Sequence, residues 1–196
     1  MAWNHLGYWG FGNVEPLLRE GGAGYAVVAG SARSVFDEVK KVLAKRDGAA
    51  VFAVNDVSVY LPVVHHMVSL HSEKLEFWRG LRKAESSVSQ GFVTHGVGPF
   101  PGPDYRWENL SPHFALSGYF AMQLAYLMGF DEIVLCGCPG DGTPRFFDPA
   151  EGRPDSFVYS QDTVLQQLEA EMKRLPGFKA RVRSMSGFTQ QYFGGV

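Results

Sequence analysis

The stretch SGYFAMQLAYLMGFDEIVLCGCPGDG, residues 117–142, decides the fold class. Its first half belongs to a run from Phe114 to Met128 that is apolar on nearly all sides, as expected for a deeply buried helix. Gly129 is the residue type that commonly ends a helix, and Ile133–Cys136 is a short apolar run typical of a buried strand. A glycine-rich loop begins at Gly137. A buried helix, a buried strand and a glycine loop in this order predict one unit of a parallel α/β sheet.

Apolar runs of strand length alternate with amphipathic segments on both sides of this stretch. Tyr25–Ala29 and Ala50–Val54 are apolar runs of strand length. Between them, apolar residues recur on one helical face. Ser34 is a candidate N-cap for this helix, and Asp47-Gly48 is a signal for its end. The other expected strands are 66–70, 91–94, 133–136 (the most apolar, expected at the sheet centre) and 179–183 (expected at an edge), and the other expected helices are 73–82, 114–128 and 162–174. This alternation predicts a single Rossmann-like α/β domain, with a mostly parallel sheet and helices on both faces.

Segments without a clear period flank the alternating part. Residues 1–23 are rich in Gly, Trp and Tyr and are expected to form an irregular lead-in. Residues 96–113 and 137–158 are long loops rich in Pro and Gly, and loops of this length in a compact domain are often functional. All are assigned to one domain over residues 1–196, because a chain of 196 residues suits one well-buried core better than two.

Composition and charge exclude several classes of partner. The net charge is −2 and basic and acidic residues are mixed along the chain, so neither nucleic acid nor a membrane surface is an expected partner. No apolar stretch approaches the roughly 20 residues of a membrane span. The N-terminal residues do not resemble a secretion signal. The two cysteines, Cys136 and Cys138, lie in and beside an expected buried strand without further metal-ligating residues next to them. They are expected to be reduced packing residues, as fits a cytoplasmic protein.

Candidate binding residues follow the first expected strand directly. In parallel sheets, ligands bind beyond the carboxyl ends of the strands. Gly30 and Ser31 form a small-residue turn before a helix, a place where backbone amides hold phosphate groups, and Arg33 and Ser34 add further donors. The alternative is an ordinary strand–helix turn that is capped by Ser34.

Polar residues also follow the second and third expected strands. Asn55 and Asp56 offer donor and acceptor groups to a base or sugar, although both residue types are also common in turns and at N-caps. His71 ends the third strand and is a candidate catalytic group. The pair His65-His66 is expected to be structural, because neighbouring side chains on a strand point to opposite faces.

Two more candidate sites surround the buried helix and the strand after it. Ser117 and Gly118 begin the helix and are expected near a ligand, although Gly118 alternatively serves close packing against the sheet. Gly137 opens a loop whose glycines allow close approach of a ligand. Asp141 in that loop is a candidate metal or ribose contact, or alternatively a turn aspartate.

Three segments together resemble a known superfamily. They are AVVAGSARSVFDEV (residues 26–39), VFAVNDVSVY (residues 51–60) and, above all, residues 117–142. Their order and spacing are similar to those of bacterial sialyltransferases of glycosyltransferase family 42 and of MptE-like 6-hydroxymethylpterin diphosphokinase-like proteins. The resemblance runs from about Tyr25 to Phe193 and includes VRSMSGFTQQYFG (residues 182–194), which looks like that family's closing strand and serine turn.

The resemblance implies a pocket for a CMP-sugar. Gly30 and Ser31 would lie near phosphate and ribose, Asn55 would contact the nucleotide, Ser117 and Gly118 would lie against the cytidine or phosphate, and the loop from Gly137 would line the pocket. The sequence departs from the family pattern at the first motif, which is GSARS instead of a GxGPS-like run. Cys138-Pro139 also replaces the acidic residue that is common after the strand glycine.

The largest departure concerns the catalytic group. The lid of the sialyltransferases carries a catalytic histidine, whereas residues 140–196 contain none. Tyr159 falls in about that region and is a candidate contact to phosphate, but a phenol does not titrate near neutrality as an imidazole does. The expected catalytic residues are therefore His71, Asp141 and Tyr159, with His95, His113 or a carboxylate as other sources of a base.

The sequence thus favours a nucleotide-dependent transferase that moves a glycosyl group from a CMP-type nucleotide sugar. The alternatives are a diphosphokinase-like transfer from ATP and a non-catalytic nucleotide-binding protein that kept the fold. The expected partner is a nucleotide or nucleotide sugar, with Mg²⁺ or Mn²⁺ as an accompanying cofactor left open, along with the oligomeric state.

Overall fold

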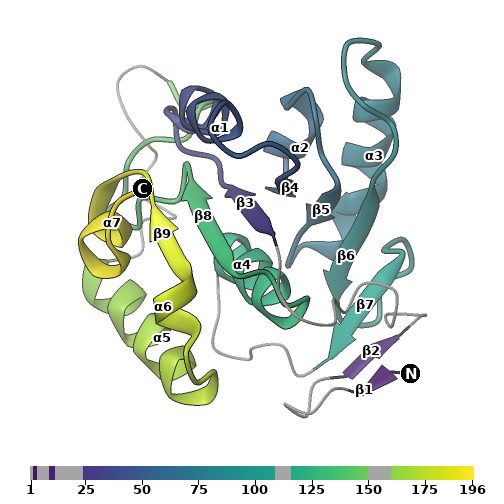
Figure 1. Cartoon of the computed structure of the whole chain (residues 1–196). Helices are drawn as coiled ribbons and strands as arrows, with labels where there is room; N and C mark the ends of the chain where they lie inside the picture. The colour runs from purple at the N-terminus through teal and green to yellow at the C-terminus, as the bar shows by residue number, and fades with distance from the viewer. Residues whose placement is uncertain (1, 4–8, 12–23, 109–115, 150–159) are drawn as a thin grey trace.

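The computed structural model describes residues 2–3, 9–11, 24–108, 116–149 and 160–196, which form a nine-stranded sheet with helices (Figure 1). The strand order is β1-β2-β7-β6-β5-β4-β3-β8-β9. The strands are β1 (Ala2–Trp3), β2 (Trp9–Phe11), β3 (Tyr25–Ala29), β4 (Ala50–Val54), β5 (His66–Val68), β6 (Val93–Val97), β7 (Tyr105–Glu108), β8 (Glu132–Cys136) and β9 (Val182–Ser184). All pairs from β7 to β9 in this order are parallel, and only β1 and β2 are added antiparallel at one edge.

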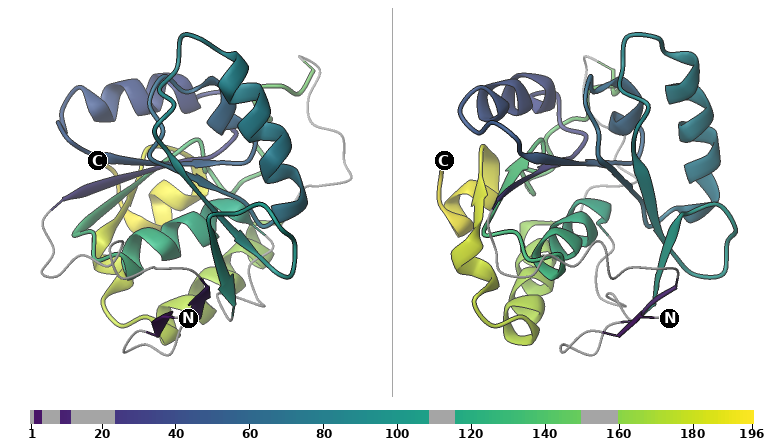
Figure 2. Two further views of the ribbon diagram at one scale, coloured as in Figure 1. Left: turned by 90° about the vertical axis from the view of Figure 1, so that its right-hand side faces the viewer. Right: turned by 45° about the vertical axis from the view of Figure 1, so that its right-hand side comes forward.

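Helices cover both faces of the sheet. The helices are α1 (Val35–Leu43), α2 (Val57–Tyr60), the 3₁₀ turn η2 (Ser72–Lys74), α3 (Leu75–Ala84), α4 (Ser117–Leu127), α5 (Gln161–Arg174), α6 (Phe178–Arg181) and α7 (Gly187–Phe193). Figure 2 shows α1 and α3 on one side of the sheet and α4 and α5 on the other. The α/β fold class, with a mostly parallel sheet and helices on both faces, is confirmed.

The chain order places a topological switch between β3 and β8. From β3 the chain adds β4, β5, β6 and β7 in one direction, then crosses back to add β8 and β9 on the other side of β3. Helices that follow β3 and β8 then leave in opposite directions, which opens a crevice at the carboxyl ends of these two strands.

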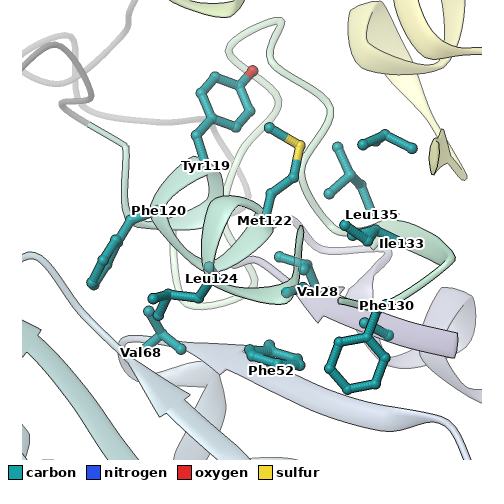
Figure 3. Close-up of a cluster of buried hydrophobic side chains, with 14 of the residues drawn as sticks. Val28, Phe52, Val68, Tyr119, Phe120, Met122, Leu124, Phe130, Ile133 and Leu135 are labelled. Atoms are coloured by element: carbon teal, nitrogen blue, oxygen red, sulfur yellow. The ribbon is translucent and has the colours of Figure 1, made fainter. Parts of the chain in front are cut away.

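The buried core explains why the central strands are apolar throughout. All five residues of β4 are buried, because α1 covers Val51 and Ala53 on one face and α4 covers Phe52 and Val54 on the other. Figure 3 shows Leu124 of α4 beside Val68, with Phe52 and Val28 beneath the helix. Burial on both faces removes the alternation that a half-exposed strand shows.

Several expectations about elements are wrong. Residues 2–3 and 9–11 of the expected irregular lead-in form β1 and β2, and the expected loop 96–113 contains β7, which pairs with both β6 and β2. Residues 179–181 of the expected last strand belong to helix α6, and only β9 after it is a strand, although it does lie at an edge. The apolar strand β8 is second from that edge and not at the sheet centre.

A buried histidine couples β5 to β6 and β7. His95 is fully buried, and Trp107 donates from Nε1 to its Nδ1 at 3.1 Å. Since indole N–H only donates, Nδ1 of His95 is unprotonated and the neutral ring carries its proton on Nε2. That nitrogen lies 3.0 Å from Nδ1 of His66, so it donates to the second ring.

Protonation of His95 is expected to destabilise the fold. Burial and the neighbouring His66 hold the pKa of His95 well below its ordinary value of 6.5, and burial lowers the pKa of His65 as well. The unfolded chain therefore binds more protons below about pH 6.5, and the free energy of unfolding should fall as pH decreases, by up to about 1.4 kcal/mol per pH unit for His95, with a smaller contribution from the exposed His65. Urea unfolding between about pH 7 and pH 5 measures this slope. His95→Gln should flatten it, and an unchanged slope in that variant would contradict the assignment.

Candidate functional site

A pocket of about 840 Å³ lies at the carboxyl ends of β3, β4, β5 and β8. Its lining comes from five segments, which lie within residues 30–32, 54–56, 71–78, 116–119 and 137–147, together with Val164 of α5. Gly30, Asn55 and Ser117, each predicted from a different strand or helix end, line this one cavity, which we call the strand-end pocket. The pocket therefore sits at the switch point between β3 and β8.

Two glycines form its floor by close approach of the backbone. Gly30 donates from its amide to the carbonyl of Cys136 at 2.8 Å, and Ala32 donates to the carbonyl of Gly137 at 3.1 Å. A Cβ on Gly30 would lie 2.4 Å from the oxygen of Gly137, and Gly137 has φ 63°, in the left-handed region. No side chain fits at either position.

A buried carboxylate forms a hydrogen bond with the backbone of the glycine floor. Glu38 of α1 is 6% exposed and accepts a hydrogen bond from the amide of Gly137 at 2.7 Å from Oε2. Burial and the charge of Glu38 raise the pKa of Cys138 to about 12 and also raise that of Cys136. Both free thiols therefore stay protonated near neutral pH and are poor nucleophiles.

Asn55 and Asp56 turn the end of β4 toward the pocket. Asn55 has φ 54°, a left-handed conformation that asparagine tolerates better than most residues, and its Oδ1 accepts from Ser69 Oγ at 2.7 Å. The next residue, Asp56, accepts from Ser31 Oγ at 3.3 Å. Burial raises the pKa of Asp56 more than hydrogen bonds from backbone amides and Ser31 and the charge of Arg145 lower it.

The start of α4 closes the side of the pocket next to β5. Ser117 is buried, and its Oγ accepts from the amide of Leu70 at 3.1 Å, which ties the helix to the end of β5. Gly118 also lines the pocket, and a Cβ there would lie 3.2 Å from Cys138 Sγ, so this glycine serves both ligand approach and close packing. His71 lies at the rim with its side chain 59% exposed and pairs with Glu73 at 3.5 Å.

The guanidinium of the pocket is Arg145, which the sequence prediction missed. An isolated bridge pairs it with Ala32, which places it beside the end of β3. Its side chain makes two-pronged contacts with the buried carboxylate of Asp148, at 2.7 Å from Nη2, and lies 4.4 Å from the ring centroid of Phe147. Lys74 is the other cation that lines the pocket within the described residues.

Three predicted site residues within the described part of the chain do not line the pocket. Arg33 donates to the carbonyls of Asp148 and Pro149 and so anchors the loop that carries Arg145. Ser34 precedes α1 without a side-chain capping bond. Asp141 accepts from the amide of Thr143 at 3.1 Å, and Tyr159 lies outside the described residues.

Several amides of the first turn also donate within the protein. Arg33 donates from its backbone to Pro144, and Val35 donates to Ala32. An anion in the pocket would therefore depend on the start of α4 and on Arg145 more than on the turn at 30–34. Of the other candidate bases, His95 is buried within the sheet and His113 lies outside the described residues, so His71 is the one histidine of the described pocket lining.

Comparisons with solved structures settle the fold. The sialyltransferase CstII from Campylobacter jejuni in complex with cytidine-5'-monophosphate matches with a TM-score of 0.57 and 13% identity, over 90% of this chain and 86% of that chain. The fold is sialyltransferase-like. The complex of the same enzyme with CMP-3FNeuAc gives a TM-score of 0.58 at 12% identity, over 88% of this chain and 86% of that one. The predicted resemblance is confirmed at the level of the fold.

A second glycosyltransferase has a similar fold. The MAf glycosyltransferase from Magnetospirillum magneticum AMB-1 matches 87% of this sialyltransferase-like chain but only 34% of its own length, with a TM-score of 0.54 and 15% identity. No family model and no curated protein matches the chain. The likeness is therefore one of fold, found in the coordinates and hardly visible in aligned residues.

The described residues contain no group of three or more His, Cys, Asp or Glu side chains placed to hold a metal ion. None of the helices in the described part of the chain has the length and apolar character to cross a membrane.

Proposed function

We propose that this chain is a glycosyltransferase that takes a sugar from a CMP-sugar bound in the strand-end pocket. The observation that carries the proposal is the meeting of the α4 N-terminus and Arg145 at a glycine-floored cavity beside the β3–β8 switch point. Both groups favour an anion, the helix through its dipole and the guanidinium through its charge. The fold is similar to that of a sialyltransferase in complex with CMP, which supports the phosphate group of CMP as this anion.

The chemistry of the proposed reaction requires stabilisation of a leaving phosphate. When the bond between the sugar and the phosphate breaks, negative charge grows on the nucleotide oxygen. Arg145 and Lys74 line the pocket as cations, and Ser31 and Ser117 offer hydroxyl groups. The glycine floor lets the nucleotide approach the backbone, because no Cβ stands in the way at Gly30 or Gly137.

Calorimetric titration with CMP tests the proposal. Arg145→Ala should weaken CMP binding about 10- to 100-fold, because a charge-assisted hydrogen bond is worth about 1.5–3 kcal/mol. Arg145→Lys should recover part of the affinity through its charge. Arg181→Ala is the matched control, since Arg181 directly precedes β9, at the amino ends of the parallel strands and away from the pocket, and donates to the carbonyl of Phe130. Urea unfolding of each variant separates lost binding from a loosened 145–148 loop.

Other nucleotides distinguish the alternatives. Thermal unfolding with CMP, UDP and ATP, with and without Mg²⁺ or Mn²⁺, should show the largest stabilisation with CMP, about 2.7 kcal/mol at 100 times the dissociation constant. Preference for ATP would favour the diphosphokinase-like alternative. CMP binding without turnover of any CMP-sugar would favour a non-catalytic binder, and no stabilisation by any nucleotide would contradict all three.

A further inference from the structure

We propose that Asp56 is the catalytic base that takes the proton of the attacking hydroxyl group. The inference rests on the proposed function and assigns the base within the same pocket. It replaces the three catalytic residues expected from the sequence, of which Asp141 is outside the lining, Tyr159 is outside the described residues and His71 lies at an exposed rim.

The backbone places the Asp56 carboxylate at the pocket in a fixed orientation. The left-handed turn at Asn55 ends β4. The backbone amide of Asn55 donates a hydrogen bond to the carbonyl of Val68 at 3.0 Å, and its side-chain oxygen accepts one from Ser69. Asp56 then lines the cavity, and Ser31 from the end of β3 donates to its Oδ1 at 3.3 Å. A catalytic group on a strand end with a locked partner is positioned more precisely than one on a loop.

The other titratable groups of the described lining are protonated, cationic or placed at the exposed rim. Tyr119 is buried and Cys138 is half-buried, and removal from solvent raises the pKa of both, so both hold their protons near neutral pH. Lys74 and Arg145 are cations without an acceptor. His71 and Glu73 pair with each other at the rim, with side chains 59% and 43% exposed, and are not enclosed by the pocket. Asp56 is the half-buried carboxylate that remains.

The electrostatics of a loaded pocket strengthen this base. The pKa of Asp56 is already raised by burial, and Arg145 is the charge that opposes the rise. A nucleotide phosphate that pairs with Arg145 would offset this opposing charge and add a negative charge nearby, which favours the protonated carboxyl. Glu73, Lys74 and His71 are the other charged or titratable groups at the pocket rim, and the protonated Cys138 and Tyr119 are those of its interior. Donor binding thus prepares the carboxylate to accept a proton.

The step balances in atoms and electrons. The acceptor O–H bond breaks and its proton moves to the Asp56 carboxylate, while the acceptor oxygen forms a bond to the anomeric carbon of the donor sugar. The bond from that carbon to the phosphate oxygen breaks, and its electron pair leaves with cytidine monophosphate. Release of the proton to solvent restores the carboxylate.

Asp56→Asn tests the assignment with CMP-N-acetylneuraminic acid as donor and water as the attacking hydroxyl. The hydrolysis rate, corrected for the uncatalysed reaction, should fall at least about 100-fold, since general base catalysis contributes 10²–10⁴-fold. CMP affinity should stay equal or increase, because the variant removes a negative charge beside the phosphate. The fall of kcat/KM toward acid pH should be present in the unsubstituted chain and absent from the residual rate of Asp56→Asn. Asp37→Asn, an exposed carboxylate of α1, is the matched control with unchanged rate.

A second variant protects the test against a folding defect. Added formate should restore part of the rate to Asp56→Ala, because a small carboxylate can occupy the vacated space, and it should not accelerate Asp37→Ala. Full activity of Asp56→Asn with CMP binding intact overturns the assignment and leaves the proposed function standing. Absence of CMP binding by the unsubstituted chain overturns the proposed function itself. CMP binding without donor turnover makes the chain a binder and overturns the base.

Discussion

Gly30→Ala is expected to destabilise the fold by about 3 kcal/mol and to abolish nucleotide binding. The added methyl group would lie 2.4 Å from the carbonyl oxygen of Gly137 and 2.5 Å from Cys138 Sγ. One of these atoms belongs to the backbone, so rotation of a side chain cannot relieve the clash. The ends of β3 and β8 would have to separate, which breaks the bond from the Gly30 amide to Cys136 and disturbs the pocket floor.

Urea unfolding and CMP titration measure the two effects of this substitution. Gly80→Ala is the matched control, because Gly80 lies within α3 and a Cβ there meets nothing within 4 Å. The control should gain about 0.5–1 kcal/mol from the higher helix propensity of alanine, without a change in CMP affinity. If Gly30→Ala were as stable as the unsubstituted chain and still bound CMP, the close approach of β3 and β8 would be refuted.

Arg82→Met is expected to cost about 3 kcal/mol or more of the free energy of unfolding. Arg82 is fully buried and donates to carbonyl and hydroxyl oxygens, with Nη1 bonded to the carbonyls of Ser58 and Leu61 at 2.6 and 2.8 Å. Its Nε donates to the carbonyl of Ser89 at 3.0 Å. Methionine fills much of the same space but leaves these buried carbonyls without donors, each at about 1–3 kcal/mol.

The loss of the buried charge offsets part of this cost. Burial lowers the pKa of Arg82, which shows that the charged form is poorly solvated. We expect the orphaned carbonyls to dominate, since several remain while a single charge is removed. Urea unfolding of Arg82→Met, beside Lys83→Met at the exposed neighbouring position, measures the difference. The Lys83 variant should stay within about 0.5 kcal/mol of the unsubstituted chain, and equal stability of the two variants would contradict the prediction.

The parallel strands were predictable where helices cover both faces. β3 and β4 have the predicted bounds, and β8 begins one residue earlier than expected. The position of β8 in the sheet was not predictable. An apolar strand shows only that both of its faces are covered, and α1 and α4 cover both faces of β8 although it lies next to the edge strand. β7 escaped prediction because its sequence, YRWE, is polar apart from Tyr105 and Trp107, and its pairing depends on β6 and β2.

The site was predictable where a residue directly follows a strand. Gly30, Ser31, Asn55 and Gly137 lie at the pocket because the backbone of the strand carries them there. Arg145 lies well beyond β8 in a loop without a periodic pattern, and its place depends on the bridge to Ala32. The guanidinium of Arg33 donates hydrogen bonds to the carbonyls of residues 148 and 149. The sequence alone could not show this, because the position of that loop depends on tertiary contacts.

The pocket lining begins at Gly30 and ends at Val164, with contributions from segments throughout the chain between them. No short segment supplies more than a small part of the pocket lining, so a ligand of this pocket binds only molecules in which all of these segments are folded together. Ligand occupancy should then slow hydrogen exchange in every strand from β3 to β8 together, instead of protecting a local patch. Binding of a pocket ligand would thus measure the fraction of fully folded protein, whether or not the ligand is turned over.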